Sequence, residues 1–277
     1  MKAYIIQPPY SMDYGEIEKN FEVELALLDQ CDSEADIIVL PEYSDVLANT
    51  PSGEDFIKAM EKFGPIIEKK AKETALRCGA VVFANFGFKT ERGYRNTTHI
   101  IDEHGQIVGR YFKAHPAPSE LKNKGYDNGY ASEPCDVYTW EWRGLRFGFR
   151  TCYDFYFYED IVEMARKDLD IIIGCSYQRT DTHRALEIMN PFLAYNTNAY
   201  LLRASISMGA DSEVCGCSMA VAPTGEILAN MKNRVGIEVV EFDPKNKYYK
   251  VSGFGGIMKS HYEYVDEGRK NNFKSVY

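Results

Sequence analysis

The sequence of 277 residues predicts an α/β fold with mixed sheets, and three observations support this fold class. Short apolar runs typical of buried strands alternate with longer amphipathic segments typical of helices. Two segments have the pattern of a hairpin, so the sheets are not expected to be wholly parallel. No linker, low-complexity stretch or block of like charge divides the chain, so we expect a single domain over residues 1–277.

In the first third of the chain, three predicted strands alternate with two predicted helices. The strands are "KAYIIQ" (2–7), "ADIIVLPE" (35–42) and "AVVFANFGF" (80–88). The first helix follows from apolar residues spaced by four and three positions, which form one face: Ile17, Phe21, Leu25 and Leu28. The second helix begins near Ser52 and ends at Gly79, and we expect it to break near Gly64-Pro65.

Two hairpins are predicted in the middle of the chain. "YRNTTHIIDEHGQIVGRYFK" (94–113) turns at "DEHG", and "EPCDVYTWEWRGLRFGFRTC" (133–152) turns at "RG". Glycine suits the left-handed position of such turns.

The remainder of the chain predicts two more helices and four strands. The helices cover 158–169 and 181–198; we expect the second to start at Asp181 as N-cap and to be interrupted at Pro191. The strands are "DIIIGCSY" (170–177), "AYLLRASIS" (199–207), "CSMAVAPTGEILA" (217–229, with an internal turn) and "GIEVVEF" (236–242). The segment 253–277 is polar, aromatic and poorly periodic, so we expect an irregular tail.

Composition excludes several classes of function. A net charge of −9 repels phosphate backbones and anionic lipid, so neither nucleic acid nor a membrane is an expected partner. No apolar run approaches the roughly 18 residues that span a bilayer, and the N-terminus lacks the pattern of a signal peptide. The sequence contains no glycine-rich phosphate-binding motif.

Seven scattered cysteines, an odd number without any C-x-x-C pair, indicate a reduced, cytoplasmic protein. Cys215 and Cys217 could supply two thiolates to a metal, but no nearby histidine or cysteine completes the four ligands that zinc prefers. In a strand, these two side chains would simply share one face.

Three reactive side chains each follow an apolar strand directly: Glu42 after "DIIVLP", Lys113 after "GQIVGRYF" and Cys152 after "LRFGFRT". Strand ends are where layered α/β proteins build their sites. Taken singly, each residue has an ordinary alternative: a loop carboxylate, a surface charge or a small core residue.

Taken together, the three segments resemble the nitrilase, or carbon-nitrogen hydrolase, superfamily. Pro41-Glu42, "GRYFKAH" and "CYDFYFYE" match its glutamate, lysine and cysteine elements, and "GCSMAVAPTGEILAN" is similar to its strand-turn-strand element. The resemblance extends from the first strand to about residue 242 and implies a four-layer α-β-β-α sandwich.

The resemblance also implies roles for the site residues. Cys152 is the nucleophile, Glu42 the general base, and Lys113 the group that stabilises the oxyanion, with the backbone N–H of Tyr153 as a second donor. Glu120, in the loop after the lysine, is expected to position the lysine and the substrate; otherwise it is an exposed carboxylate. His115 in the same loop is the rival base for a Cys-His mechanism, although prolines constrain its segment.

Substrate-binding residues are harder to assign because relatives often carry an arginine just after "C-Y-D", where this chain has Phe155 and Tyr156. Arg150 is one candidate, unless it forms a salt bridge outside the pocket. Tyr177 and Arg179 are others, unless Arg179 is a solvated loop residue.

The implied activity is hydrolysis of an amide or N-carbamoyl bond of a small molecule through a cysteine thioester, without a metal or organic cofactor. Nitrile hydrolysis, acyl transfer to another acceptor and a non-catalytic, metabolite-binding relative stay open as alternatives. The resemblance further implies a homodimer in which the tail, residues 253–277, packs on the partner subunit. The sequence does not specify the substrate.

Overall fold

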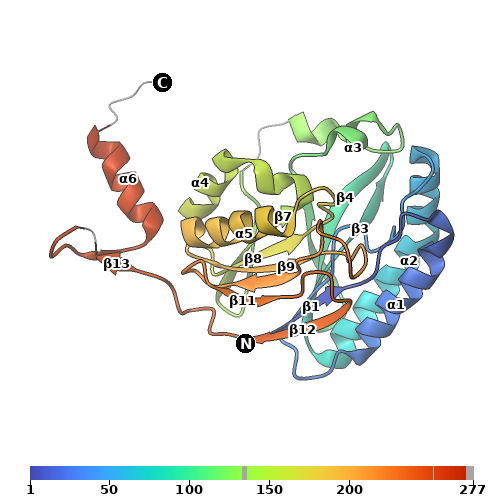
Figure 1. Cartoon of the computed structure of the whole chain (residues 1–277), viewed down its shortest axis with the longest axis horizontal. Coiled ribbons are helices and arrows are strands. Elements are labelled where there is room, and N and C mark those ends of the chain that lie inside the picture. Colours follow the sequence, from blue (N-terminus) through green and yellow to red (C-terminus); the bar gives the residue numbers. More distant parts are fainter. Residues whose placement is uncertain (133–135, 252, 273–277) are drawn as a thin grey trace.

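The structure, a computed structural model, describes residues 1–132, 136–251 and 253–272. Two six-stranded mixed sheets face each other, and helices cover the outer face of each (Figure 1). The predicted four-layer α-β-β-α sandwich is therefore confirmed.

The first sheet places parallel strands at its centre and antiparallel strands at its edges. Strands β1, β2 and β3 are parallel neighbours, while β12, β4 and β5 run antiparallel to the strands beside them. In spatial order the strands are β12 (Gly236–Glu241), β1 (Lys2–Gln7), β2 (Ile37–Val39), β3 (Val81–Thr90), β4 (Gly93–Ile101) and β5 (Ile107–Phe112).

The second sheet repeats this arrangement, with β7, β8 and β9 parallel at its centre. Its spatial order is β11 (Ile227–Asn230), β10 (Met219–Val221), β9 (Tyr200–Ala204), β8 (Ile171–Cys175), β7 (Leu145–Thr151) and β6 (Thr139–Trp142). Strand β2 leads into Glu42, β5 into Lys113 and β7 into Cys152. Lys113 and Cys152 follow their strands directly, as the sequence predicts, whereas Leu40 and Pro41 separate Glu42 from the end of β2.

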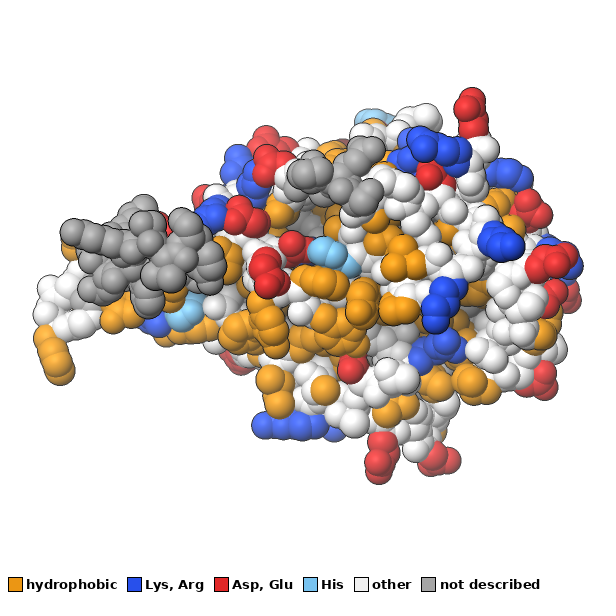
Figure 2. All heavy atoms as spheres, turned by 90° about the horizontal axis from the view of Figure 1, so that it is seen from above, with side chains coloured by type: hydrophobic (Ala, Val, Ile, Leu, Met, Phe, Trp, Pro, Cys, Tyr) orange, Lys and Arg blue, Asp and Glu red, His pale blue; other side chains and the backbone are white. Residues whose placement is uncertain are grey.

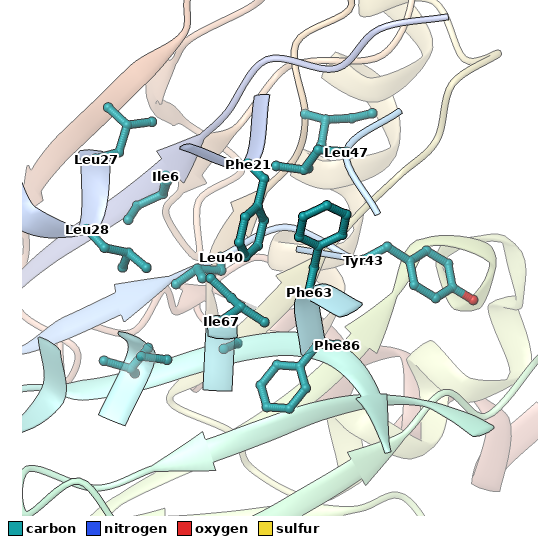
Figure 3. Packing of buried hydrophobic residues seen from close by; sticks show 14 of the residues in the cluster. Ile6, Phe21, Leu27, Leu28, Leu40, Tyr43, Leu47, Phe63, Ile67 and Phe86 are labelled. Carbon is teal, nitrogen blue, oxygen red and sulfur yellow. The ribbon is translucent and has the colours of Figure 1, made fainter. Parts of the chain in front are cut away.

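Three apolar clusters hold the four layers together. One lies between the first sheet and helices α1 (Ile17–Gln30) and α2 (Gly53–Cys78), one lies between the two sheets, and one lies between the second sheet and helices α4 (Tyr158–Arg166) and α5 (His183–Thr197). Figure 3 shows the first cluster, in which Phe21 and Phe63 meet with ring centroids 4.7 Å apart. Burial of these apolar side chains is the main source of stability for the sandwich.

Two helices depart from the sequence prediction because proline does not interrupt them. Helix α2 continues through Pro65 and ends at Gly79 with φ +67°, and α5 continues through Pro191. A proline removes one intrahelical hydrogen bond, but both helices keep a buried face against a sheet that offsets this loss. The N-cap of α5 is Thr182, which accepts from the N–H of Ala185, and Asp181 is therefore not the cap.

The C-terminal segment is not irregular throughout, contrary to the prediction. A short hairpin, β13 (Lys250–Val251) with β14 (Met258–Lys259), precedes helix α6 (His261–Asn272), and together they form an arm that extends from the body (Figure 1). We call residues 250–272 the C-terminal arm. The last five residues of the predicted tail lie outside the described residues.

Within the described ranges, the longest and most apolar helices still fall short of what a membrane span requires. The cytoplasmic location that the cysteines indicate stays a prediction.

Candidate active site

The loop after β2 carries Glu42 and is fixed to the neighbouring strand β3. Tyr43 has φ +56°, a left-handed conformation that few side chains adopt without support. Its N–H donates to Asn85 Oδ1 at 3.0 Å, and the N–H of Ser44 donates to the Asn85 carbonyl at 3.0 Å. These two hydrogen bonds to β3 stabilise the turn, and they thereby fix the position of the fully buried Glu42.

Asp45 in the same loop is fully buried and accepts from the N–H of Gly87 at 2.8 Å. Burial raises the pKa of its carboxyl from 3.8 to about 7. The folded state therefore favours the protonated acid, and this contribution to stability is present below about pH 4 and lost as pH rises to about 7. The loss amounts to about 4 kcal/mol at most.

We therefore expect Asp45→Asn to be more stable than wild type at pH 8.5 and similar to it near pH 4.5. Asparagine keeps an acceptor for Gly87 and carries no charge to bury. Thermal unfolding across this pH range measures the difference. If the melting temperatures of the two proteins changed in parallel with pH, the raised pKa assigned to Asp45 would be wrong.

Cys152 lies at the tip of a tight turn after β7 and has φ +47°. The buried carboxylate of Asp154 fixes this turn, because it accepts from the N–H of Thr151, the N–H of His115 and the hydroxyl of Tyr111, each at 2.8 Å. The aspartate of the "CYD" element thus serves to hold the cysteine in a strained conformation.

Lys113 lies between two carboxylates. Its Nζ is 2.8 Å from Glu42 Oε1 and 2.8 Å from Glu120 Oε2. Asn96 Nδ2 bridges the same two residues, at 2.7 Å from Glu42 Oε1 and 2.8 Å from Glu120 Oε1. All four side chains are buried. Only Glu42 Oε2 among these carboxylate oxygens has no hydrogen-bond donor in the described part of the chain.

Glu120 is buried in the short helix α3 (Pro118–Lys122), and it is not the exposed loop carboxylate that the sequence left open. It accepts from the N–H of Ala117 at 2.5 Å and from the hydroxyl of Tyr43, which in turn accepts from Tyr126. Figure 3 shows the Tyr43 hydroxyl directed away from the apolar cluster on which its ring packs.

The pKa values of the two carboxyls are driven in opposite directions. Burial raises the pKa of Glu42, and Lys113 offsets this only in part. Burial acts on Glu120 too, but Lys113 and the hydrogen bond from Asn96 lower its pKa overall. Glu120 is thus the permanent counter-ion, while Glu42 is the better proton acceptor and donor.

The other two groups titrate far from neutrality. Burial, and then the charge of Glu42, raise the pKa of the Cys152 thiol well above its usual value. Burial alone would lower the pKa of Lys113, but Glu120 and Glu42 raise it well above its usual range. At neutral pH the site therefore holds an ammonium and a neutral thiol, with the raised pKa of Glu42 bringing this carboxyl closer to the thiol in proton affinity.

A cavity of about 710 Å³ joins these residues to the surface. The side chains of Glu42, Lys113, Glu120 and Cys152 all line it. Three other predicted residues, Tyr153, Tyr177 and Arg179, line the same cavity. Arg179 Nη1 donates to Tyr10 Oη at 2.7 Å and to Asn49 Oδ1 at 3.1 Å, so this cation is held by neutral partners within the described structure.

Arg150 and His115, by contrast, do not line the cavity that contains Cys152. Arg150 Nη1 is 2.6 Å from Asp160 Oδ2, and His115 Nε2 is 2.7 Å from the same oxygen. The His115 ring stacks on Phe157 with centroids 3.6 Å apart. The salt bridge outside the pocket, which the sequence left open for Arg150, is the observed arrangement, because the arginine follows the outer face of β7 toward α4.

Asn96 is the site residue that the sequence analysis missed. It lies within the polar run "RNTTH" of β4, and its side chain also accepts from Asn85 Nδ2 at 2.9 Å. A strand that buries several consecutive polar residues departs from the usual alternation, and this departure is the signal that could have revealed it.

The described residues contain no group of three or more His, Cys, Asp or Glu side chains arranged to hold a metal. Cys215 and Cys217 are buried in a loop with φ +63° and +54°, so the strand-like arrangement considered for them is wrong.

Comparison with known proteins identifies the family. The model of the carbon-nitrogen hydrolase family matches residues 2–246. The chain belongs to the carbon-nitrogen hydrolase family. It is therefore an enzyme that hydrolyses carbon–nitrogen bonds other than peptide bonds, and the predicted resemblance to the nitrilase superfamily is confirmed.

This carbon-nitrogen hydrolase has similar proteins among characterised enzymes and solved structures. The 2-oxoglutaramate amidase of Bacillus subtilis is 26% identical over 252 residues, covering 88% of this chain and 92% of the relative. A variant of the amidase from Nesterenkonia sp. AN1, solved with acrylamide added to its active-site cysteine, superposes with a TM-score of 0.68 at 16% identity, covering 88% of this chain and 93% of that one. The NitFhit protein of C. elegans superposes with a TM-score of 0.68 at 18% identity, and the match covers 98% of this chain and 63% of that one.

Proposed function

We propose that this carbon-nitrogen hydrolase cleaves the amide bond of a small molecule through a thioester on Cys152, with Glu42 as general base and acid. The observation that carries the proposal is the placement of Glu42 and Lys113, 2.8 Å apart, in one cavity that Cys152 also lines. The names of the Bacillus and Nesterenkonia relatives favour an amide over a nitrile.

In the first half of the reaction, Glu42 Oε2 takes the thiol proton as the sulfur attacks the amide carbon. The oxyanion that forms is stabilised by Lys113 Nζ and by the N–H of Tyr153; one such donor contributes about 3 kcal/mol. Glu42 then gives its proton to the departing nitrogen, and ammonia or an amine leaves.

In the second half, Glu42 removes a proton from water, and the resulting hydroxide attacks the thioester carbon. The sulfur leaves and recovers a proton from Glu42, and the carboxylic acid is released. Glu120 and Asn96 take no proton in this scheme, since their function is to hold the ammonium and the base in place.

Release of ammonia from a panel of primary amides tests the proposal. We expect ammonia and carboxylate in equal amounts, and a hydroxamate when hydroxylamine replaces water as the acceptor. Cys152→Ala should form none of these products. Ammonia release by Cys152→Ala at the wild-type rate would refute the proposal.

Arg179 is proposed to bind an anionic group of the substrate remote from the amide. Among the described residues no carboxylate lies within 4.0 Å of its guanidinium nitrogens, and the Tyr177 ring packs on it at 5.1 Å. We expect Arg179→Gln to raise KM about tenfold for amides that carry a second carboxylate and to leave KM for neutral amides unchanged. Lys122→Gln, at the exposed rim of the same cavity, is the control. An equal change in KM for dicarboxylate-derived and neutral amides would argue against Arg179 as the anion-binding residue.

A homodimer is proposed to form through α4, α5 and the C-terminal arm. Large apolar side chains are exposed on each of them, including Tyr158, Ile188, Phe192 and Ile257. Figure 2 shows hydrophobic side chains gathered on the face beside the arm. A second copy of the chain would cover them with the same surface by two-fold symmetry.

Ile188→Glu is expected to convert the dimer to a monomer, because the symmetry places two unpaired carboxylates in the interface. Light scattering after size-exclusion chromatography measures the mass. Leu76→Glu, at an exposed apolar position on α2, should leave the dimer intact. A monomeric wild type would overturn the proposed interface.

A further inference from the structure

A second cavity, of about 490 Å³, lies on the outer side of the first sheet, between α2 and strands β3, β4 and β5. It shares no lining residue with the cavity that contains Cys152. Phe86, which Figure 3 labels within the first apolar cluster, lies on its wall. The mechanism proposed above makes no use of this space.

Two polar side chains meet in this cavity. His99 of β4 and Arg110 of β5 are paired directly across the two strands, so both side chains leave the same face of the sheet. The His99 ring stacks on Phe86 with centroids 3.8 Å apart, and the Arg110 guanidinium lies over the Phe88 ring at 4.6 Å. The rings of Phe88 and His99 are in contact at 6.1 Å, so one small ligand can reach both polar groups.

Both side chains carry nitrogens without a hydrogen-bond partner. His99 is 1% exposed, and its Nδ1 and Nε2 are buried with no partner in the described part of the chain. The buried Nε of Arg110 likewise donates to no described group. Buried polar groups of this kind destabilise a fold unless a partner reaches them, so both side chains favour a ligand with hydrogen-bond acceptors.

The acidic side chains on the cavity wall are already paired. Glu61 lies 3.0 Å from Lys89 Nζ, and Glu68 lies 2.5 Å from Lys72 Nζ. Arg110, by contrast, has no carboxylate within 4.0 Å among residues 1–132, 136–251 and 253–272. The cavity therefore contains one uncompensated cation.

The surroundings of His99 also favour an anion. Burial lowers the pKa of its imidazole to about 3; the charges of Arg110 and Lys72 add to this shift, and the backbone of Phe86 opposes it. The ring is neutral near pH 7 and offers one N–H donor and one acceptor. A cationic ligand would be repelled here, whereas an anion would be attracted by Arg110 and could accept from the imidazole N–H.

Much of the remaining wall is apolar, and it is formed by Met60, Pro65, Phe86, Phe88 and Tyr94. A cavity of this volume with apolar walls and a few polar groups is typical of a site for a small organic ligand. We infer that it binds a small carboxylate with an apolar body, whose oxygens accept from Arg110 and His99. This inference does not depend on the proposed thioester mechanism.

Isothermal titration of the full chain with phenylacetate tests the inference, with 2-phenylethanol as the uncharged ligand of similar shape. We expect saturable binding of one phenylacetate per chain and at least about tenfold weaker binding of 2-phenylethanol. Arg110→Gln should weaken phenylacetate binding about tenfold. His99→Phe, which keeps a ring to stack on Phe86 but removes both ring nitrogens, should weaken it about fivefold.

Two control variants show where phenylacetate binds. Lys89→Gln removes a cation of the same cavity that Glu61 already neutralises, so we expect binding within about twofold of wild type. Arg179→Gln, in the cavity that contains Cys152, should leave binding unchanged.

Two results would overturn the inference. One is the absence of saturable phenylacetate binding to the wild type. The other is binding that Arg110→Gln leaves intact, and its loss in Arg179→Gln would then place phenylacetate in the Cys152 cavity. Arg110 is partly exposed, so Arg110→Gln remains informative even if the buried His99→Phe fails to fold.

Discussion

Replacing Lys113 with methionine is expected to reduce amide hydrolysis at least about 10³-fold and to lower the free energy of unfolding by about 3–5 kcal/mol. The side chain is 1% exposed and is the only cation within 4.0 Å of either Glu42 or Glu120 in the described structure. Without it, two buried carboxylates face each other unpaired, and the oxyanion loses its charged donor. Steady-state kinetics and urea unfolding measure the two effects.

Lys122→Met is the matched control. Lys122 also lines the cavity, but it is exposed, and no described carboxylate pairs with it. We expect the free energy of unfolding of Lys122→Met to remain within about 0.5 kcal/mol of the wild-type value. If Lys113→Met and Lys122→Met behaved alike, the buried ion pairs would not have the importance assigned to them.

Glu42→Gln is expected to lower kcat/KM about 10³-fold while the fold is retained. The glutamine Oε1 can still accept from Lys113 and Asn96, so the hydrogen-bond network persists, but the new side chain cannot take a proton from the thiol. The circular dichroism spectrum of the variant should match that of the wild type. The loss of kcat/KM should arise from a slower acylation step.

Glu120→Gln distinguishes the base from the positioning carboxylate. It leaves Glu42 to accept the proton, so we expect a smaller loss of kcat/KM and a shifted pH–rate profile, because Lys113 loses one of its two counter-ions. A larger loss of kcat/KM in Glu120→Gln than in Glu42→Gln would indicate that Glu120 is the base and Glu42 the positioning carboxylate.

Most of the fold could be predicted from the sequence because its strands are short, apolar and bounded by clear turns. The failures concern features that tertiary contacts determine. Pro65 and Pro191 break a local helix pattern, yet packing against the sheets keeps α2 and α5 continuous. The C-terminal arm has little periodicity of its own, and contacts such as Arg166 Nε to Tyr262 Oη at 2.8 Å help to dock α6.

The site could be predicted in part. Lys113 and Cys152 follow strands directly, Glu42 follows β2 after two intervening residues, and all three positions are visible in the sequence. The position of Asn96 between two carboxylates is not visible in the sequence, because it depends on the pairing of β4 with β3 and β5. Likewise, the alternation of side chains along β7 could not show that Arg150 pairs with Asp160 of a helix that follows later.

Mass spectrometry of the quenched enzyme reveals whether the thiol of Cys152 becomes acylated during turnover. After rapid mixing with an amide substrate and acid quench, we expect the acyl mass on the peptide that contains Cys152, and its loss on treatment with hydroxylamine. Cys152→Ala should carry no adduct. An unmodified Cys152 peptide during steady-state turnover, or an acyl group on another of the seven cysteines, would show that Cys152 is not the nucleophile.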